Sequence, residues 1–408
     1  MGERVVILGA GHAGGQAAIS LRQAGWDGDI LILGEEPYPP YQRPPLSKDY
    51  LAGKLEMARL FLRPQSFYET KAIACRSGCR VEAIDRDRKS LRLADGEALG
   101  YDKLILATGT RPRRLKVPGA DLPNIFCLRT IEDVHAIQPR FESGERIAIV
   151  GAGYIGLEVA AVAAKRGMKV HVIEAAERVL ARVSSPLVAD FYADVHRNAG
   201  VDIRLSASLT AFEGHNKVER LVLADGGRLD ADLVIVGIGV VPNQELAAEA
   251  GLKCDNGIWV DDCARTEDAA IFAAGDCANH FNALAGRRLR LESVQNAVEQ
   301  AKAAALAICG KPQPWQGVPS FWSDQYDLKL LTNGIIEGYD DIVLRGNMDQ
   351  RKFAAFYMKD GRMIASDCVN APADHMGARN LIASQKVLPT DELGNPAIPL
   401  KEILASAA

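Results

Sequence analysis

One pattern occurs twice in this chain: an apolar strand, a Gly-x-Gly-x-x-Gly turn, a helix, a second strand and an acidic residue. The first turn spans residues 9–14 and its acid is Glu35, and the second turn spans residues 151–156 and its acid is Glu174. In such a unit the first glycine makes the turn, the second lets backbone N–H groups approach a pyrophosphate, and the third lets helix and strand pack closely. The helix N-terminus attracts the phosphates, and the acid accepts hydrogen bonds from a ribose. The two copies predict an α/β protein with two Rossmann-like dinucleotide-binding domains.

The repeat extends beyond the two turns. Residues 104–112 and 234–242 both read as a buried strand that opens into a Gly-x-x-Pro turn, which indicates two related halves. Residues 266–276 predict a short strand that ends at a Gly-Asp pair, and residues 293–308 predict a helix. We expect these two later segments to return to the first domain.

A third domain is predicted at the end of the chain. Residues 319–369 are rich in aromatic and β-branched residues and read as antiparallel strands, and helices are expected at 375–386 and 398–406. The expected turns are the pairs Asn333-Gly334, Gly346-Asn347 and Asp360-Gly361. This pattern is typical of an α+β domain.

Composition excludes several classes of protein. The 408 residues contain 48 Lys plus Arg and 52 Asp plus Glu, and a net charge of −4 argues against a general nucleic-acid binder. No apolar stretch approaches the ~18 residues that a membrane span needs. The eight cysteines are scattered, with no C-x-x-C pair and no zinc-type spacing, as is typical of reduced cytosolic thiols. We therefore expect a soluble, cytoplasmic protein without a metal site.

The motifs together resemble a known superfamily. The two glycine turns, the Ala-Thr-Gly-x-x-Pro junction at 107–112 and the Ile-Phe-Ala-Ala-Gly-Asp strand end at 271–276 resemble the two-dinucleotide flavoproteins that include glutathione reductase. Within that superfamily, segments 43–48, 153–158 and 321–325 resemble the FAD-dependent, NADH-linked ferredoxin reductases of oxygenase systems.

The resemblance implies domains, cofactors and a partner. FAD would bind residues 1–112 and 245–318, NADH would bind residues 113–244, and residues 319–408 would form the C-terminal α+β domain. The reaction would be hydride transfer from NADH to FAD and then single-electron transfers to a [2Fe-2S] ferredoxin supplying a monooxygenase or a ring-hydroxylating dioxygenase. Such ferredoxins are acidic, so a basic docking face is expected. Its candidate residues are Arg63, Arg111, Arg113, Arg114, Lys116, Arg287, Arg288, Arg290 and Lys311.

The positions of the cysteines separate this branch from its relatives. Disulfide reductases of the superfamily carry a redox cysteine pair beside the flavin, and its peroxidases and water-forming oxidases need a single cysteine there. Segments 38–50 and 130–145, where those cysteines would stand, contain none. Cys75 and Cys79 fit neither location, and we interpret them as structural because free cysteine is commonly a small buried hydrophobe.

Two residues are expected to carry the chemistry. The resemblance places Lys48 beside the flavin, where it would stabilise the charge left by reduction, and Glu158 near enough to position Lys48 and the nicotinamide. An alternative interpretation of Lys48 is a solvated lysine on a helix that begins with proline.

The resemblance also assigns residues that contact the cofactors. Those for FAD are Gly9, Gly11, His12, Ala13, Gly14, Glu35, Arg43, Lys48, Val81, Ala107, Thr108, Gly109, Arg129, Gly275, Asp276, Val294 and Trp322. Those for NADH are Gly151, Gly153, Tyr154, Ile155, Gly156, Glu158, Glu174, Arg182, Gly237, Ile238 and Gly239. The acid Glu174 favours NADH because it repels the extra phosphate of NADPH, although Arg178 and Arg182 could soften that preference.

Two alternatives stay open at this point. One is a flavoprotein resembling apoptosis-inducing factor, in which binding matters more than turnover. The other is an NADH oxidase that lacks the active-site cysteine.

Overall fold

The computed structural model describes residues 2–143 and 146–407, which form two compact units. Unit 1 consists of Met1–Arg43, Glu56–Arg111 and Val241–Pro319. Unit 2 consists of Pro44–Leu55, Pro112–Val240 and Ser320–Ala408. The short strands β8 (Thr110–Pro112) and β17 (Val240–Pro242) straddle boundaries between the two units in the sequence. The three-domain division expected from the sequence stays a prediction.

Unit 1 is built on a five-stranded parallel sheet. Its strand order is β19-β7-β1-β2-β3. Its strands are β1 (Arg4–Leu8), β2 (Asp29–Leu33), β3 (Ile73–Arg76), β7 (Lys103–Leu106) and β19 (Ile271–Ala273). The run Val5–Leu8 is buried throughout, as expected of a central strand with both faces covered. β19 therefore returns to the first sheet, as the sequence predicts.

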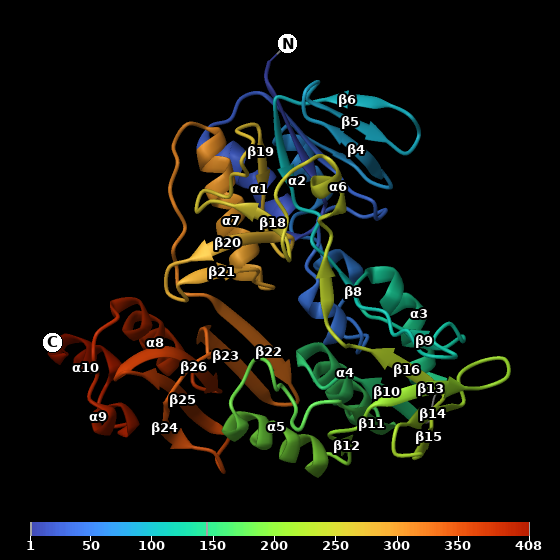
Figure 1. Ribbon diagram of the computed structural model, residues 1–408, viewed down its shortest axis with the longest axis vertical. Coiled ribbons are helices and arrows are strands. Elements are labelled where there is room, and N and C mark those ends of the chain that lie inside the picture. Colours follow the sequence, from blue (N-terminus) through green and yellow to red (C-terminus); the bar gives the residue numbers. More distant parts are fainter. Residues whose placement is uncertain (1, 144–145, 408) are drawn as a thin grey trace. The chain divides into compact units, whose positions relative to one another are not determined.

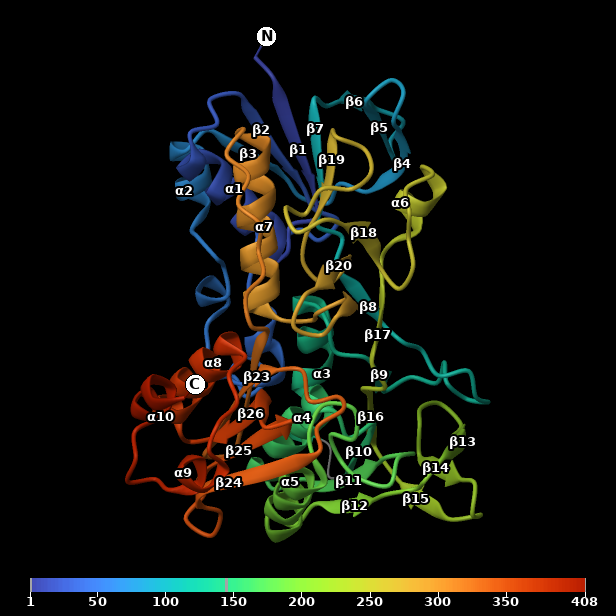
Figure 2. The ribbon, with the colours of Figure 1, turned by 60° about the vertical axis from the view of Figure 1, so that its left-hand side comes forward.

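Two alanine-rich helices cover one face of this sheet. Helices α1 (His12–Ala24) and α7 (Val294–Ile308) lie side by side in Figure 1 and Figure 2. The small side chains of Ala17, Ala18 and Ala301 are buried between them, which lets the helices approach closely.

Small sheets and short helices complete unit 1. One antiparallel sheet holds β4 (Val81–Asp85), β5 (Ser90–Leu93) and β6 (Ala98–Gly100), and another sheet holds β18 (Ile258–Val260), β20 (Ala278–Asn282) and β21 (Arg287–Leu289). The short helices are η2 (Met57–Arg59), α2 (Gln65–Thr70) and α6 (Glu245–Glu249).

Unit 2 contains a second parallel sheet. Its order is β12-β11-β10-β16-β9, with β9 (Ile125–Phe126), β10 (Arg146–Val150), β11 (Lys169–Ile173), β12 (Asp202–Arg204) and β16 (Leu233–Val236). The helices of this part are η1 (Pro44–Ser47), α3 (Ile131–Ser143), α4 (Tyr154–Lys165) and α5 (Pro186–Asn198). A small antiparallel sheet holds β13 (Leu209–Glu213), β14 (Arg220–Leu223) and β15 (Arg228–Asp230).

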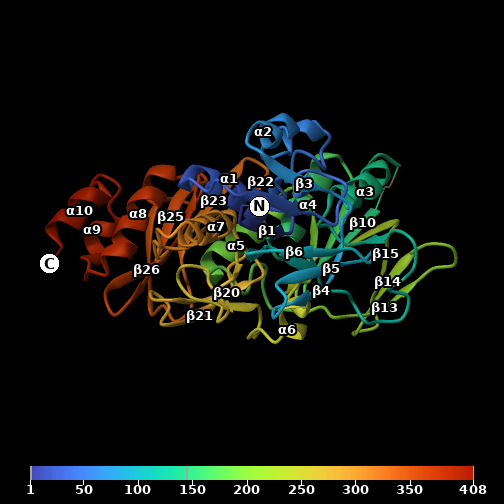
Figure 3. The ribbon, with the colours of Figure 1, turned by 90° about the horizontal axis from the view of Figure 1, so that it is seen from above.

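The last part of unit 2 is an antiparallel sheet with helices. Its order is β22-β23-β26-β25-β24, with β22 (Ser320–Gln325), β23 (Leu328–Gly334), β24 (Asp341–Asn347), β25 (Lys352–Lys359) and β26 (Arg362–Val369). Helices α8 (Pro372–Ser384), α9 (Thr390–Gly394) and α10 (Leu400–Ser406) lie beside it (Figure 3). The α/β class with two Rossmann-like sheets and a C-terminal α+β part is thus confirmed.

Two predicted turns were wrong. Asn333-Gly334 and Gly346-Asn347 lie at the ends of β23 and β24, and the chain reverses after each pair. The turn at Asp360-Gly361 is where it was expected, between β25 and β26. In the part of the chain that the structure describes, no helix is both long and apolar enough to cross a membrane.

Candidate functional site

The first glycine turn is closed by its own backbone. A Cβ at Gly9 would lie 2.2 Å from the Ala107 carbonyl oxygen, and a Cβ at Gly14 would lie 1.9 Å from the Gly9 carbonyl oxygen. A Cβ at Gly11, in contrast, would meet no described protein atom within 4 Å. Two of the three glycines are therefore required by the fold, and the third leaves its side open to a ligand.

The N-terminus of α1 fits a phosphate. Gly11 caps this helix without a side-chain hydrogen bond, so the first N–H groups and the positive end of the helix dipole are available to an anion. His12 follows, and its buried Nδ1 has no hydrogen-bond partner in the described structure. Burial lowers the pKa of His12, and the nearby Asp276 opposes that shift. Gly275 packs here as well, since a Cβ on it would lie 2.9 Å from the Ala13 Cβ.

The predicted pocket residues Thr108 and Gly109 are held by a residue that the sequence did not indicate. Asn243 donates from its side-chain amide to the Thr108 carbonyl at 2.9 Å and from its backbone to the Gly109 carbonyl at 2.9 Å. Thr108 Oγ1 donates in return to the Asn243 carbonyl at 2.6 Å. Thr108 and Asn243 are 135 positions apart in the sequence, so no local sequence pattern predicts their contact.

Glu35 and Arg43, two of the charged residues assigned to FAD in unit 1, differ in their surroundings. Glu35, two residues after β2, forms an exposed pair with Arg80 at 3.2 Å. Arg43 forms a partly buried pair with Glu36 at 2.6 Å and donates to the Tyr41 hydroxyl at 2.9 Å. The guanidinium of Arg43 is therefore positioned by neighbours that the sequence did not single out.

The second glycine turn repeats the geometry of the first. A Cβ at Gly151 would lie 2.4 Å from the Gly237 carbonyl oxygen, and a Cβ at Gly156 would lie 2.0 Å from the Gly151 carbonyl oxygen. A Cβ at Gly153 would meet no described atom within 4 Å, as at Gly11. The turn at the start of α4 therefore has the same opening toward a ligand.

Glu174 and Arg182 lie beside this second turn. Glu174 accepts from the backbone N–H of Ala152 at 2.7 Å and from that of Ala176 at 2.8 Å, which fixes its carboxylate at the end of β11. Arg182 lies against Gly239, where a Cβ would come within 3.3 Å of a guanidinium nitrogen. An acid held against the glycine turn is suited to bind a ribose diol.

The central polar feature of unit 2 is the pair of Lys48 and Glu158. Their side chains form an ion pair of 2.7 Å and are 16% and 3% exposed. Glu158 also accepts from Ser47 Oγ at 2.5 Å and from Ser323 Oγ at 2.6 Å. Lys48 is therefore paired and largely buried, which rules out its interpretation as a solvated lysine. Sequence reasoning missed both serines.

Aromatic side chains lie around the start of α4. Tyr154 stacks on Phe321, with ring centroids 4.5 Å apart. The ring centroids of Phe321 and Trp322 are 6.5 Å apart. Burial raises the pKa of Tyr154, so its hydroxyl stays protonated. Phe321 belongs to the same segment as Trp322 but was not among the predicted site residues.

The predicted site residues divide between the two units. Unit 1 holds Gly9, Gly11, His12, Ala13, Gly14, Glu35, Arg43, Val81, Ala107, Thr108, Gly109, Gly275, Asp276 and Val294. Unit 2 holds Lys48, Arg129, Gly151, Gly153, Tyr154, Ile155, Gly156, Glu158, Glu174, Arg182, Gly237, Ile238, Gly239 and Trp322.

All eight cysteines are free thiols. Burial raises the pKa of every one of them, for example that of Cys75 and that of Cys254 to about 11. A protonated thiol is a poor nucleophile. The structural interpretation of Cys75 and Cys79 agrees with these surroundings.

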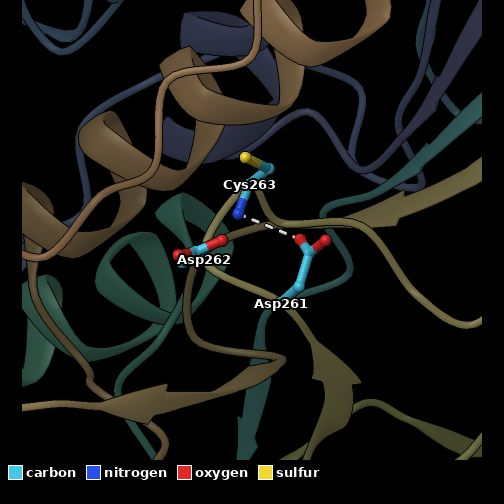
Figure 4. Close-up of side chains that lie close together, drawn as sticks. All are labelled: Asp261, Asp262 and Cys263. Carbon is cyan, nitrogen blue, oxygen red and sulfur yellow. Dashed lines mark hydrogen bonds between the residues drawn. The ribbon is translucent and has the colours of Figure 1, made fainter.

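One cluster has the composition of a metal site. Asp261, Asp262 and Cys263 offer ligand atoms within 4.8 Å of one another (Figure 4). The Asp261 carboxylate, however, accepts from the backbone N–H groups of Cys263 at 2.9 Å and Arg265 at 2.8 Å. These bonds close a turn, which accounts for the arrangement.

Several of the basic docking candidates make internal contacts. Arg290 pairs with Glu292 at 2.8 Å, and Arg288 donates to the Asn279 carbonyl at 2.8 Å and lies 4.0 Å over the Trp259 ring. These two residues stabilise unit 1 and are poor candidates for docking. The candidates that are exposed are Arg63, Arg111, Arg113, Arg114, Lys116, Arg287 and Lys311.

Comparisons with known proteins cover nearly the whole chain. Residues 3–301 match the family described as pyridine nucleotide-disulphide oxidoreductase, and residues 320–404 match the reductase C-terminal family. Putidaredoxin reductase of Pseudomonas putida is 44% identical over 99% of this chain and 97% of its own. A rubredoxin–NAD(+) reductase of the same organism is 42% identical over 90% of this chain and 96% of its own. The crystal structure of the covalent putidaredoxin reductase–putidaredoxin complex matches with a TM-score of 0.96 and 44% identity over 99% of both chains.

Proposed function

The chain belongs to the pyridine nucleotide-disulphide oxidoreductase family, and from this premise we propose that it is an FAD-dependent NADH:ferredoxin reductase. It passes electrons from NADH through FAD to a [2Fe-2S] ferredoxin that supplies an oxygenase. The observation that carries the proposal is the buried pair of Lys48 and Glu158. Lys48 occupies the segment in which disulfide reductases of the family carry their redox cysteines. Because no cysteine stands there to accept electrons from the flavin, we infer that the electrons pass to a separate partner protein.

Two glycine turns suit the two cofactors. The opening at Gly11 and the buried, unpartnered Nδ1 of His12 fit the pyrophosphate of FAD, and the opening at Gly153 fits that of NADH. FAD, when bound, accepts two electrons from NADH as a hydride and gives them up singly. Lys48 supplies a positive charge that stabilises negative charge on a reduced flavin, and Glu158 holds the ammonium group in place.

Glu174 selects NADH. Its carboxylate is fixed at the second turn by two backbone N–H groups, so it meets a 2′-phosphate with unfavourable charge and a 2′-hydroxyl with a hydrogen bond. The kcat/KM for NADH is therefore expected to exceed that for NADPH. A ratio that favours NADPH would contradict this assignment.

The decisive experiment compares electron acceptors. Cytochrome c reduction by NADH is measured with a [2Fe-2S] ferredoxin, with a rubredoxin and with no carrier. We expect fast reduction with the ferredoxin only. The rubredoxin arm is included because a relative of 42% identity is a rubredoxin–NAD(+) reductase. Equal rates without a carrier would show that electrons reach cytochrome c without a ferredoxin and would overturn the proposal.

Salt dependence tests how the partner docks. The exposed basic residues Arg113, Arg114 and Lys116 form a cluster after β8 and suit an acidic ferredoxin. Screening at high ionic strength is expected to slow ferredoxin reduction, while the reduction of bound FAD by NADH stays unchanged. We also propose a cytoplasmic location, as expected for a chain with reduced thiols.

A further inference from the structure

A chain of hydrogen bonds in unit 2 ends on Glu158. The Tyr326 hydroxyl lies 3.0 Å from His196 Nδ1, and His196 Nε2 lies 2.9 Å from Gln325 Oε1. Gln325 Nε2 lies 3.1 Å from Ser323 Oγ, which lies 2.6 Å from Glu158 Oε1. His196, Gln325 and Ser323 are buried, so water does not compete with these contacts.

The direction of every bond in this chain is determined. A carboxylate only accepts, so Ser323 must donate to Glu158 and accept from the Gln325 amide. The Gln325 carbonyl oxygen then accepts from His196 Nε2–H, which leaves His196 Nδ1 to accept from the Tyr326 hydroxyl. Burial lowers the pKa of His196 to about 4, so the ring is neutral at pH 7 and carries one proton, as this order requires.

Tyr326, at the end of the hydrogen-bond chain farthest from Glu158, has an unfavourable backbone conformation. Tyr326 has a φ of 57° in the two-residue turn between β22 and β23, a region that favours glycine. Its carbonyl accepts from Lys165 Nζ at 2.8 Å, and its ring lies edge-on to His196 with centroids 4.9 Å apart. Glycine there would relieve the backbone but would remove the hydroxyl that begins the chain.

Glu158 is therefore held from two sides. Lys48 and Ser47 bind its Oε2, while the chain reaches its Oε1 through Ser323. All donors of the chain point toward the carboxylate, and bonds aligned in this way polarise and strengthen one another.

We propose that this chain of hydrogen bonds positions Glu158, and with it Lys48, for the reduction of FAD. His196 is the key positioning residue of the hydrogen-bond chain. The inference rests on the proposed function for its kinetic consequence. His196 has no part in the chemistry itself, because it contacts Gln325 and Tyr326 rather than the Lys48 and Glu158 pair.

Two substitutions of His196 distinguish an effect of the hydrogen-bond chain from an effect of side-chain packing. In His196→Gln the side-chain amide nitrogen can take the place of Nε2 and still donate to Gln325, whereas in His196→Asn it can reach only the place of Nδ1. A displaced carboxylate misaligns the reacting groups, so we expect His196→Asn to slow flavin reduction by NADH about tenfold or more. His196→Gln should stay within about twofold of the parent, with the NADH dissociation constant unchanged in both.

A matched control lies on the same helix, α5. The buried Tyr192 hydroxyl has no hydrogen-bond partner among the described residues, so Tyr192→Phe should leave flavin reduction unchanged. Anaerobic stopped-flow absorbance measures the rates, and thermal unfolding reports the stability of all variants. If His196→Asn reduces flavin as fast as the parent, or if His196→Gln is as slow as His196→Asn, the proposal is wrong.

A second measurement does not depend on turnover. Nitrogen-15 NMR spectra of histidine-labelled protein should show His196 as the neutral Nε2–H form, with no titration between pH 6 and 8. An Nδ1–H form or a titration in that range would overturn the deduced direction. Should the parent protein fail to accept hydride from NADH, the proposed function fails, while these spectra still report on the chain.

Discussion

At the scale of single residues, we expect the buried pair of Lys48 and Glu158 to contribute both to stability and to the proposed reaction. Replacing Lys48 by methionine leaves the Glu158 carboxylate buried without its counter-charge, and breaking a buried pair from one side costs about 3–5 kcal/mol. We expect Lys48→Met to lower the free energy of unfolding by an amount of this order and to slow flavin reduction. Urea unfolding measures the first effect, and stopped-flow absorbance measures the second.

The double variant Lys48→Met/Glu158→Gln is the control. It removes both charges, so it should recover part of the lost stability while flavin reduction stays slow. Unchanged reduction rates in either variant would contradict the assigned roles.

Substitutions at two glycines of the second turn are expected to have different effects, one on stability and the other on NADH binding. Gly156→Ala places a Cβ 2.0 Å from a backbone oxygen, so we expect a loss of stability of about 2 kcal/mol or more. Gly153→Ala meets no described protein atom and should unfold like the parent. Its methyl group would enter the proposed pyrophosphate site, so we expect it to raise the KM for NADH about tenfold. Thermal unfolding and steady-state kinetics on both variants make the comparison, and a normal KM in Gly153→Ala would contradict the placement of the ligand.

At the scale of elements, Arg345 holds the end of the chain to its sheet. This residue of β24 is 5% exposed and pairs with Asp374 of α8 at 2.9 Å. It also donates to backbone carbonyls of the segment around α9, namely those of Leu393, Asn395, Pro396 and Ile398. Arg345→Met leaves these groups without their donor, so we expect a loss of about 3 kcal/mol and faster proteolysis between α8 and α10. Arg351→Met, which breaks an exposed pair with Asp327, should cost less than about 1 kcal/mol.

The same scale shows where sequence reasoning succeeds and fails. The glycine turns and the central strands could be predicted because each belongs to a local motif, whereas the pair of Lys48 and Glu158 was expected only from the resemblance to a known family. Asn333 was read as a turn residue, but its buried amide donates to the His375 carbonyl at 2.9 Å, so a tertiary contact overrides the local preference. Ser323 and Asn243 contact residues more than 130 positions away, and no local pattern predicts such partners.

At the scale of the whole molecule, a buried carboxyl makes stability depend on pH. Asp367 accepts from Ser184 at 2.6 Å and from Tyr357 at 2.7 Å, and burial raises its pKa to about 6 although both hydroxyl groups oppose the shift. A pKa that is higher in the folded state stabilises the protein fully below pH 3.8, and this contribution is lost as pH rises through 6.

The variant Asp367→Asn isolates this contribution. Relative to the variant, the parent should lose up to about 3 kcal/mol of unfolding free energy between pH 4 and pH 7, because one pKa unit corresponds to about 1.4 kcal/mol. Urea unfolding of both proteins at several pH values measures the difference. Parallel curves would show that Asp367 is not the group responsible.

The raised pKa values of all eight thiols affect how this protein reacts with alkylating agents and oxidants. A protein whose cysteines are poor nucleophiles is slow to be alkylated, glutathionylated or cross-linked by peroxide. Its turnover is therefore expected to be insensitive to reagents that react only with thiolates.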